Sequence, residues 1–414
     1  MKKECSIIFY EGWIDIAPTV LNLAKALYDK NYNVTIYCRQ SQFNTPNNKY
    51  FFDKFVSVVY FESLSQISNS LFLLKILFKL LNVLKLGTLI PLIDVIFFWF
   101  QIRICKSKHT IGLIHNELII GIDTNGAIVS LLESILVQTK NLVYLSLELT
   151  RKENFRYFDK ARYFLDKISY KNSKCLIIQD DDRFNNISKY SGYDQKNVFY
   201  IPNSDALGMN FVEDPNFNYF RQIFDLDNNH YSCIVVHPGM ICDEVFSKEL
   251  AASFKSINTG YALVFHERCK RSLDDPYLKS LKEINSKNLF LSLDPVPYEQ
   301  IYKIFISTNV GIAFYKDIDE NFSQISKASG KLALYLKYGK PVLMNDLESF
   351  RNLNDKYKLG IIIKDVSNHI EIESAIEEIM KNYEYFSENA LTCFKKEFDF
   401  TVNVSPFLDF LEIC

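Results

Sequence analysis

The triplet Ser329-Gly330-Lys331 has residue types that suit phosphate binding at the start of a helix. Serine is a frequent helix N-cap, glycine leaves the first-turn amides open to approach, and lysine adds a positive charge. Those amides have no partner within the helix and carry positive partial charge, which favours an anion. A Walker loop is excluded, because Ile325 and Leu332 stand where that motif needs glycine and a hydroxyl residue. A simple helix cap followed by a surface lysine is the alternative.

A helix over residues 329–338 is expected to carry this triplet. Gly339 marks its end and Pro341 follows two residues later, which is the usual order of a glycine stop and a proline. Apolar strands are predicted on both sides, at 310–316 and 340–346. A helix that follows a strand in a parallel sheet begins near the carboxyl end of that strand, where ligands bind.

Strands and helices alternate through the whole chain. Two consecutive sets of such elements predict an α/β fold with two doubly wound parallel-sheet domains. The first set has predicted strands at 5–10, 33–38, 110–115, 118–123, 141–148, 174–180 and 197–203. The second set has strands at 231–239, 261–267, 288–293, 310–316, 340–346 and 359–365, with helices at 244–257, 274–285, 297–307, 329–338 and 369–382.

Residues that follow the predicted strands form a second group of candidates. Acids dominate the first half, where Asp123 and Glu148 end two strands, and basic residues are confined to the second half. A cleft between the halves would then have an acidic wall and a partly basic wall, which suits an enzyme that holds a phosphate and activates a hydroxyl. Polar residues commonly follow strands, so an ordinary surface role is the alternative. The second-half candidates are Gly239, His266, Arg268 and Lys316.

Length, composition and charge exclude several classes of protein. A chain of 414 residues with 48% hydrophobic and 23% charged residues is too long for one typical core and too apolar for disorder. A net charge of −2 argues against a nucleic-acid partner. No two of the nine cysteines are separated by two residues, so we expect buried thiols in a reducing compartment rather than a zinc ribbon. The first residues lack a secretory pattern, so a cytoplasmic location is expected.

Residues 71–104 are the most apolar segment, and charged residues interrupt them too often for a membrane span. Lys75, Lys79 and Asn82 lie on one face of a predicted helix, with apolar residues over the rest. Such a basic amphipathic helix can lie on an anionic membrane surface, so peripheral contact with the inner face of the cell membrane is one hypothesis. The other is a core helix whose lysines face water.

The order of these pieces resembles the GT-B fold of nucleotide-sugar-dependent glycosyltransferases, in which two Rossmann-like domains face across a cleft. The segment "SGKLALYLKYGKPVLMND" is similar to the donor-site helix of the retaining family that contains bacterial lipopolysaccharide and capsule transferases. "NVFYIPNSD" resembles the family's interdomain linker, and "IVVHPGM" its entry to the donor domain. The resemblance implies an acceptor domain at 1–204, a donor domain at 205–395, and a segment at 396–414 that packs back on the first domain.

The chain departs from this family at two donor-site positions. The family commonly carries two glutamates eight positions apart, and here those positions are Ser326 and Leu334. The chain is similar instead to a branch with a Ser-Gly-Lys helix start. In that branch Lys331 would balance the diphosphate charge, with support from Arg268 or Lys270, and no metal or other cofactor is expected.

The resemblance implies glycosyl transfer from a nucleoside-diphosphate sugar to a surface glycan, and a lipid-linked form of that acceptor is expected. Asp123, Glu148 or Asp15 would orient or deprotonate the acceptor hydroxyl, with Asp123 preferred because it ends a strand at a turn. Two other functions stay open. The missing glutamates favour a non-catalytic scaffold or regulator, and a nucleotide-sugar epimerase of the same fold would need no acceptor.

Overall fold

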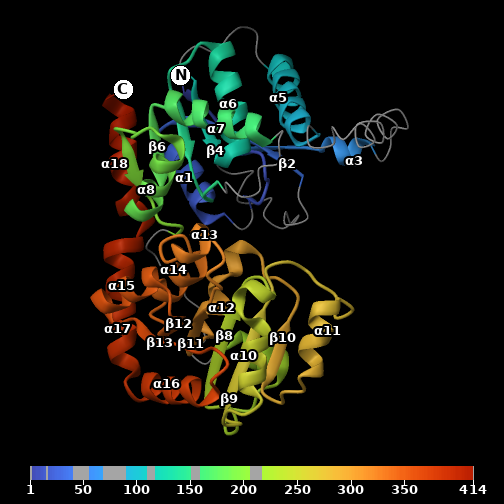
Figure 1. The fold of residues 1–414 in the computed structure, drawn as a ribbon, viewed down its shortest axis with the longest axis vertical. Coiled ribbons are helices and arrows are strands. Elements are labelled where there is room, and N and C mark those ends of the chain that lie inside the picture. Colours follow the sequence, from blue (N-terminus) through green and yellow to red (C-terminus); the bar gives the residue numbers. More distant parts are fainter. Residues whose placement is uncertain are drawn as a thin grey trace. The chain divides into compact units, whose positions relative to one another are not determined.

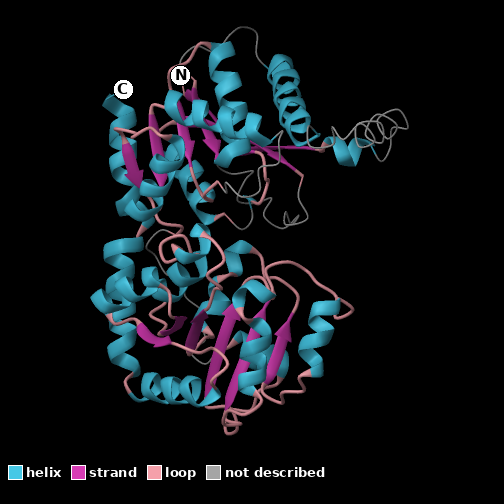
Figure 2. Ribbon diagram, viewed as in Figure 1, coloured by secondary structure: helices cyan, strands magenta, loops and turns pink. Residues whose placement is uncertain are grey.

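The computed structural model describes residues 2–14, 17–40, 56–68, 90–109, 117–150, 159–205 and 217–413. The chain forms two compact units, one made of Met1–Ile201 with Val404–Cys414 and the other of Pro202–Asn403 (Figure 1). Each unit has a parallel sheet flanked by helices, as Figure 2 shows by the magenta strands and cyan helices. The predicted fold class, α/β with two doubly wound sheets, is confirmed.

The first unit contains a seven-stranded sheet in the order β3-β2-β1-β4-β5-β6-β7. Its central strand β4, with the sequence LIIGI, is buried along its whole length, as expected for a strand covered on both faces. The strands are β1 (Lys3–Phe9), β2 (Tyr32–Arg39), β3 (Ser57–Phe61), β4 (Leu118–Ile122), β5 (Leu142–Leu145), β6 (Cys175–Ile178) and β7 (Val198–Tyr200). The helices are α1 (Pro18–Asp29), α3 (Leu64–Ser68), α5 (Ile90–His109), α6 (Asp123–Val137), α7 (Asp159–Asn172) and α8 (Asp181–Ser191).

The second unit contains a six-stranded sheet in the order β10-β9-β8-β11-β12-β13, with an apolar cluster on each face. The strands are β8 (Cys233–Pro238), β9 (Tyr261–His266), β10 (Leu289–Ser292), β11 (Val310–Ala313), β12 (Val342–Asn345) and β13 (Gly360–Ile363). The helices are α9 (Tyr219–Phe224), α10 (Ser247–Phe254), α11 (Pro276–Glu283), α12 (Tyr302–Ile306), α13 (Glu320–Ser323), α14 (Gly330–Lys337), α15 (Glu348–Tyr357), α16 (His369–Lys381) and α17 (Tyr383–Cys393). A last helix, α18 (Phe400–Ile413), is divided between the two units.

Each sheet has a point where the strand order reverses, between β1 and β4 in the first unit and between β8 and β11 in the second. Helices after two such strands lie on opposite faces, so the carboxyl ends of the strands border a crevice where ligands bind. The turn after β1 and the first residue of α6 lie at the reversal point of the first sheet, and the turns after β8 and β11 lie at that of the second.

The structure differs from the predicted elements in several places. Asp123 was expected in a turn but is the first residue of α6, directly after β4. The edge strand β3 and the helices α15 and α17 were not predicted. The predicted strand at 110–115 and the lysines at 75 and 79 lie outside the described residues. Among the helices that the structure describes, none is long and apolar enough to cross a membrane.

The end of the chain returns to the first unit. Helix α18 begins in the second unit, and its residues from Val404 onward belong to the first. The ring of Phe199 in β7 lies 5.5 Å from that of Phe407 and 5.2 Å from that of Phe410. Lys30 also forms a 2.6 Å ion pair with Glu412. The last residues therefore complete the core of a unit that begins at the other end of the chain.

Tyr335 of α14 fixes this helix against the reversal point of the second sheet. The register pairs Val310 with Val235 and Gly311 with Val236. At the next position the Tyr335 hydroxyl accepts a hydrogen bond from the Ile312 amide at 3.2 Å and donates one to the Val236 carbonyl at 2.6 Å. One buried hydroxyl thus replaces the next ladder interaction between β8 and β11.

Tyr335→Phe should lower the free energy of unfolding by about 2 kcal/mol, because it leaves a buried amide and a buried carbonyl without partners. Guanidinium denaturation followed by tyrosine fluorescence and circular dichroism measures this loss. The matched control is Tyr385→Phe, since Tyr385 is 54% exposed. Equal stability of the two variants would contradict the bridging role of the hydroxyl.

Candidate functional site

The start of α14 is built as an N-terminal cap with free amides. Ser329 is buried, and its Oγ accepts a hydrogen bond from the Leu332 amide at 3.3 Å. The same Oγ lies 2.7 Å from the hydroxyl of Tyr315, so the cap is anchored to the chain after β11. Within the described part of the chain, the amides of Gly330 and Lys331 have no acceptor. Two donors at the positive end of a helix are therefore available to an anion.

The direct contacts of the Lys331 amine are with neutral side chains and not with acids. Its Nζ is 2.9 Å from Nε2 of His237 and 4.5 Å from the ring centre of Tyr315. No carboxylate of the described residues pairs with it, whereas Lys316 and Lys337 both have carboxylate partners. Burial lowers the pKa of Lys331 to about 7, with Cys242 opposing the shift and the charge of Arg268 adding to it. When it is protonated, this amine has no carboxylate counter-ion among the described residues.

His237, next to the end of β8, is fully buried beside that amine. Its Nδ1 has no hydrogen-bond partner, and its ring packs edge-on against that of Phe265 at 5.5 Å. Burial, and then the charge of Lys331, hold the pKa of His237 well below its usual range. The imidazole is therefore neutral at physiological pH and serves as a hydrogen-bonding partner rather than as a second cation.

The loop after β8 is rigidly supported. Gly239 has a φ of 111°, which favours glycine, and no atom lies within 4 Å of the place where a Cβ would stand. The fully buried Glu267 accepts hydrogen bonds from the amide of Ile241 at 3.2 Å and from Nη1 of Arg271 at 2.9 Å. Arg271 also donates to the Ile241 carbonyl at 2.7 Å. These bonds anchor the turn, and open space remains beside the Cα atom of Gly239.

The other three basic candidates occupy different environments. Arg268 is exposed, and its Nη2 lies 3.0 Å from Sδ of Met240. His266 is buried, with Nδ1 2.8 Å from Oγ of Ser292, and burial lowers its pKa to about 4. Lys316 forms ion pairs with Asp243 at 2.8 Å and Glu249 at 3.2 Å. Of these three, Arg268 acts electrostatically on Lys331, while the other two side chains are engaged elsewhere.

In the first unit Asp123 is held by the loop after β5. Its Oδ1 accepts hydrogen bonds from the amides of Leu147 at 2.7 Å and Glu148 at 2.9 Å, and its φ is 53°. Burial raises the pKa of Asp123 well above its usual range, and the neighbouring Glu11 raises it further. Glu148 is exposed at the same loop. Asp15 lies outside the described residues.

Glu11 is a second buried carboxyl at this edge of the sheet. Its Oε1 accepts a hydrogen bond from Nδ2 of Asn125 at 3.0 Å, and its Oε2 is buried with no partner. Burial raises the pKa of Glu11 to about 7, against a lowering by hydrogen bonds and by the charge of Arg162. Two carboxyls with raised pKa values thus border the crevice between β1 and β4.

Several solved structures share this architecture over nearly their whole length. HepE from Anabaena, crystallised with UDP and glucose, is 12% identical, with 100% of both chains covered and a TM-score of 0.69. An α,α-trehalose-phosphate synthase (UDP-forming) from Burkholderia vietnamiensis is 10% identical over 100% of both chains, with a TM-score of 0.62. The chain has the GT-B fold.

A structure proposed to be a UDP-N-acetylglucosamine 2-epimerase from Listeria monocytogenes shares the fold less closely. It is 10% identical, with 94% of this chain and 91% of that chain covered and a TM-score of 0.53. No protein-family model matches the sequence, and no curated protein matches it. At these identities the comparisons show the GT-B fold and leave the activity to be argued from the residues.

Three residues beside the candidate groups were not predicted as site residues: His237 and Tyr315 next to the start of α14, and Glu11 beside Asp123. His237 lies two residues before Gly239, and Tyr315 directly precedes Lys316. Glu11 lies two residues after the end of β1. Proximity to the predicted residues was the available signal. Neither the His237–Lys331 contact nor the Tyr315–Ser329 contact follows from sequence spacing, because each depends on how strands pack beside α14.

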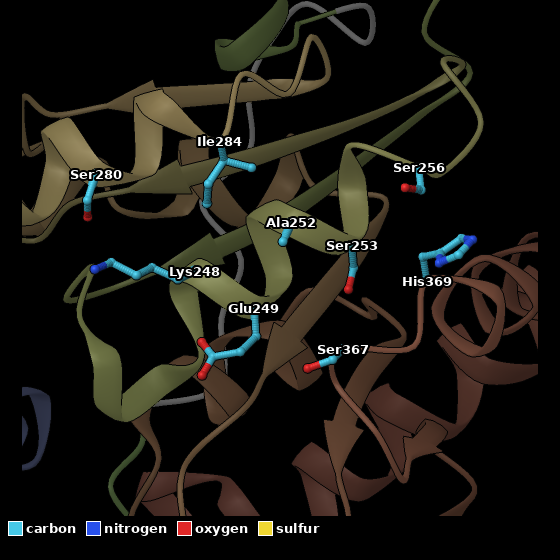
Figure 3. Close-up of a pocket in the computed structure, with 9 residues that line it drawn as sticks. All are labelled: Lys248, Glu249, Ala252, Ser253, Ser256, Ser280, Ile284, Ser367 and His369. Atoms are coloured by element: carbon cyan, nitrogen blue, oxygen red, sulfur yellow. The ribbon is translucent and has the colours of Figure 1, made fainter.

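A hollow of about 570 Å³ lies elsewhere in the second unit, and none of the predicted site residues lines it (Figure 3). Its one link to them is Glu249, which pairs with Lys316. The lining residues come from α10 with the segment after it, from α11 with the residue after it, and from the start of α16 with the loop before it. They are Lys248, Glu249, Ala252, Ser253, Ser256, Ser280, Ile284, Ser367 and His369. No group of three His, Cys, Asp or Glu residues in the described ranges could hold a metal.

Proposed function

We propose that this chain is a glycosyltransferase that takes a hexose from a nucleoside-diphosphate sugar. The observation that carries the proposal is the start of α14, where the amine of Lys331 lies beside two free amides and lacks a carboxylate partner. Such a site has the charge and donors that a diphosphate needs. The shared fold adds support, since HepE has also been crystallised with UDP-glucose.

The leaving diphosphate would be stabilised as it forms. The amides of Gly330 and Lys331 have no acceptor among the described residues, and the Lys331 amine supplies positive charge, with Arg268 as a second cation acting on that amine. Donors that are fixed before the reaction stabilise developing negative charge without reorganisation. We propose that these groups meet the charge of the leaving group without an obligatory metal ion. Gly239 would let the donor approach the backbone closely.

Asp123 is the proposed proton acceptor for the acceptor hydroxyl. Two backbone amides fix its carboxyl, and its raised pKa brings it closer to the range of an efficient general base. Glu148 and Asp15 are the other acids proposed for acceptor binding.

The proposed acceptor is a surface glycan on a lipid carrier, reached at the inner face of the cell membrane from the cytoplasm. Its structural support is an exposed apolar stripe on α5, the described part of the predicted amphipathic segment. The stripe has helical spacing, so its members share one face. It consists of Ile93, Ile96, Phe100 and Ile104.

Two other functions share part of this support. An epimerase of the same fold would use the same diphosphate site without an acceptor. A non-catalytic scaffold would fit the loss of carboxylates at Ser326 and Leu334. Release of UDP from a UDP-sugar only when an acceptor is present favours the transferase, whereas interconversion of sugars favours the epimerase. Binding of UDP without either reaction favours the scaffold.

Lys331→Met should weaken UDP binding about 10-fold to 100-fold, because a hydrogen bond to a charged group contributes about 1.5–3 kcal/mol. Isothermal titration calorimetry measures the affinity. The control is Lys381→Met, which removes an exposed lysine at the end of α16. Equal affinities for UDP in both variants would remove Lys331 from the donor site.

Asp123→Asn should lower kcat by about 100-fold or more and leave UDP affinity unchanged, because the amide keeps an oxygen for the two backbone donors but cannot accept a proton. Turnover of the donor with acceptor glycan is the measurement. Circular dichroism of the variant checks the fold. Wild-type kcat in this variant would exclude Asp123 as the base.

Replacing Phe100 and Ile104 by serine should reduce the fraction that sediments with phosphatidylglycerol vesicles, since binding scales with buried apolar area. Phe164→Ser is the matched control, because Phe164 is 62% exposed on α7 of the same unit. An unchanged sedimenting fraction in the double variant, or an equal loss in the control, would contradict membrane contact through α5.

A further inference from the structure

The contact between Lys331 and His237 limits how many protons the pair can hold. Two nitrogen atoms 2.9 Å apart need one hydrogen between them, so one must donate and the other accept. Full protonation of both side chains would place two donors against each other in a buried site. The imidazole is neutral, so the state of the pair depends on the amine of Lys331.

The surroundings of the amine do not favour its charged form strongly. The neighbours are His237 on β8, Tyr315 after β11, Cys242 in the loop after β8, and Arg268 after β9. The Tyr315 ring face attracts a cation, but burial and the charge of Arg268 oppose one. Among the described residues no carboxylate pairs with the amine. In the absence of an anion, this lysine therefore has little to keep its proton at alkaline pH.

A diphosphate would reverse this balance. An anion at the free amides of Gly330 and Lys331 would place negative charge beside the amine and favour the ammonium form. A group that gains a proton when a ligand binds makes the affinity of that ligand depend on pH.

We propose that, above neutral pH, Lys331 of the free protein is a neutral amine hydrogen-bonded to His237, and that it takes up one proton from solvent when the diphosphate binds. The proposal rests on the donor site inferred above and specifies how that site obtains its charge. His237 is a positioning residue, because its Nε2 orients the amine without touching the donor. The proton comes from the buffer and remains on Nζ while the diphosphate is bound, and no covalent bond is made or broken.

The direction of the pH dependence follows from the two states of the amine. The free protein has a lowered lysine pKa of about 7, and the bound state has a higher one. Uptake is therefore small below about pH 6 and approaches one proton at pH 8. The affinity for UDP falls by up to about tenfold per pH unit above pH 7, until the pH reaches the bound-state pKa.

The test is calorimetric titration of the full chain with UDP at pH 8, in Tris and in HEPES at equal ionic strength. The terminal phosphate of UDP has a pKa of about 6, so it is ionised at pH 8 and any proton taken up goes to the protein. The difference in observed enthalpy between buffers gives the number of protons. We expect about one for the wild type.

Lys331→Arg separates charge from protonation. Arginine stays charged at every pH used, so this variant should bind UDP with almost no proton uptake and an affinity that does not fall between pH 7 and 9. Lys331→Met supplies a second variant at this position, with weaker binding and no uptake. Uptake by Lys331→Arg equal to that of the wild type would assign the proton to another group and overturn the proposal.

His237 variants test the positioning role. His237→Leu removes the acceptor, so the uptake should begin at lower pH, whereas His237→Gln keeps an acceptor and should preserve the wild-type midpoint. Identical midpoints in all three proteins would exclude His237 as a partner. The failures are distinguishable, because UDP binding without buffer-dependent enthalpy overturns proton uptake alone, whereas no UDP binding by the wild type overturns the donor site itself.

Discussion

The hydroxyl of Tyr335 is the interaction on which the second unit's site depends. It joins β8 to β11 at the point where their direct pairing stops, and it belongs to the helix whose first turn carries the free amides. Direct pairing of β8 with β11 therefore ends at the reversal point without leaving the Ile312 amide and the Val236 carbonyl unpaired. The same bond fixes α14, so the position of Ser329 and Lys331 is set by a contact one turn further along the helix. The hydroxyl oxygen of Tyr335 thus contributes both to the position of α14 and to the pairing of the sheet.

The two units place ionisable groups of opposite charge at the reversal points of their sheets. The first brings two carboxyls, Glu11 and Asp123, into a buried edge where desolvation disfavours their charged forms. The second buries an amine with only neutral or cationic partners nearby. Some other buried charges are paired, as in the ion pair between Arg39 and Asp94 at 3.0 Å. Ionisable groups with shifted pKa values at strand ends where the fold predicts ligands are typical of functional sites.

Much of the fold could be predicted from sequence, because central strands of a parallel sheet are buried on both faces and read as continuous apolar runs. The edge strand β3 is half exposed, so its residues Ser57–Phe61 lack that pattern. Helix α15 is rich in asparagine and charge, and only Phe350 and Leu353 of it are fully buried. Weak burial explains why such elements escaped prediction.

The candidate site was predictable only in part. Ser329 as a cap follows from residue type, and its bond to the Leu332 amide has the expected form. The roles of His237 and Tyr315 do not follow, because their partners lie 94 and 14 residues away and meet through packing. Asp123 was placed at the correct strand end, but its left-handed backbone and helical position were not anticipated. Spacing along the chain identifies residues at a sheet edge, whereas contacts across that edge need coordinates.

The return of residues Val404–Cys414 to the first unit has a consequence for biosynthesis. A ribosome makes the chain from its first residue, and domains commonly fold as soon as they emerge. Here β7 receives the rings of Phe407 and Phe410 only after the whole of the second unit has been synthesised. The second unit is nearly complete before that moment, although it is made later. The first unit to be synthesised is therefore the last to finish folding, and a chain truncated before Val404 would have a complete second unit joined to an incomplete first one.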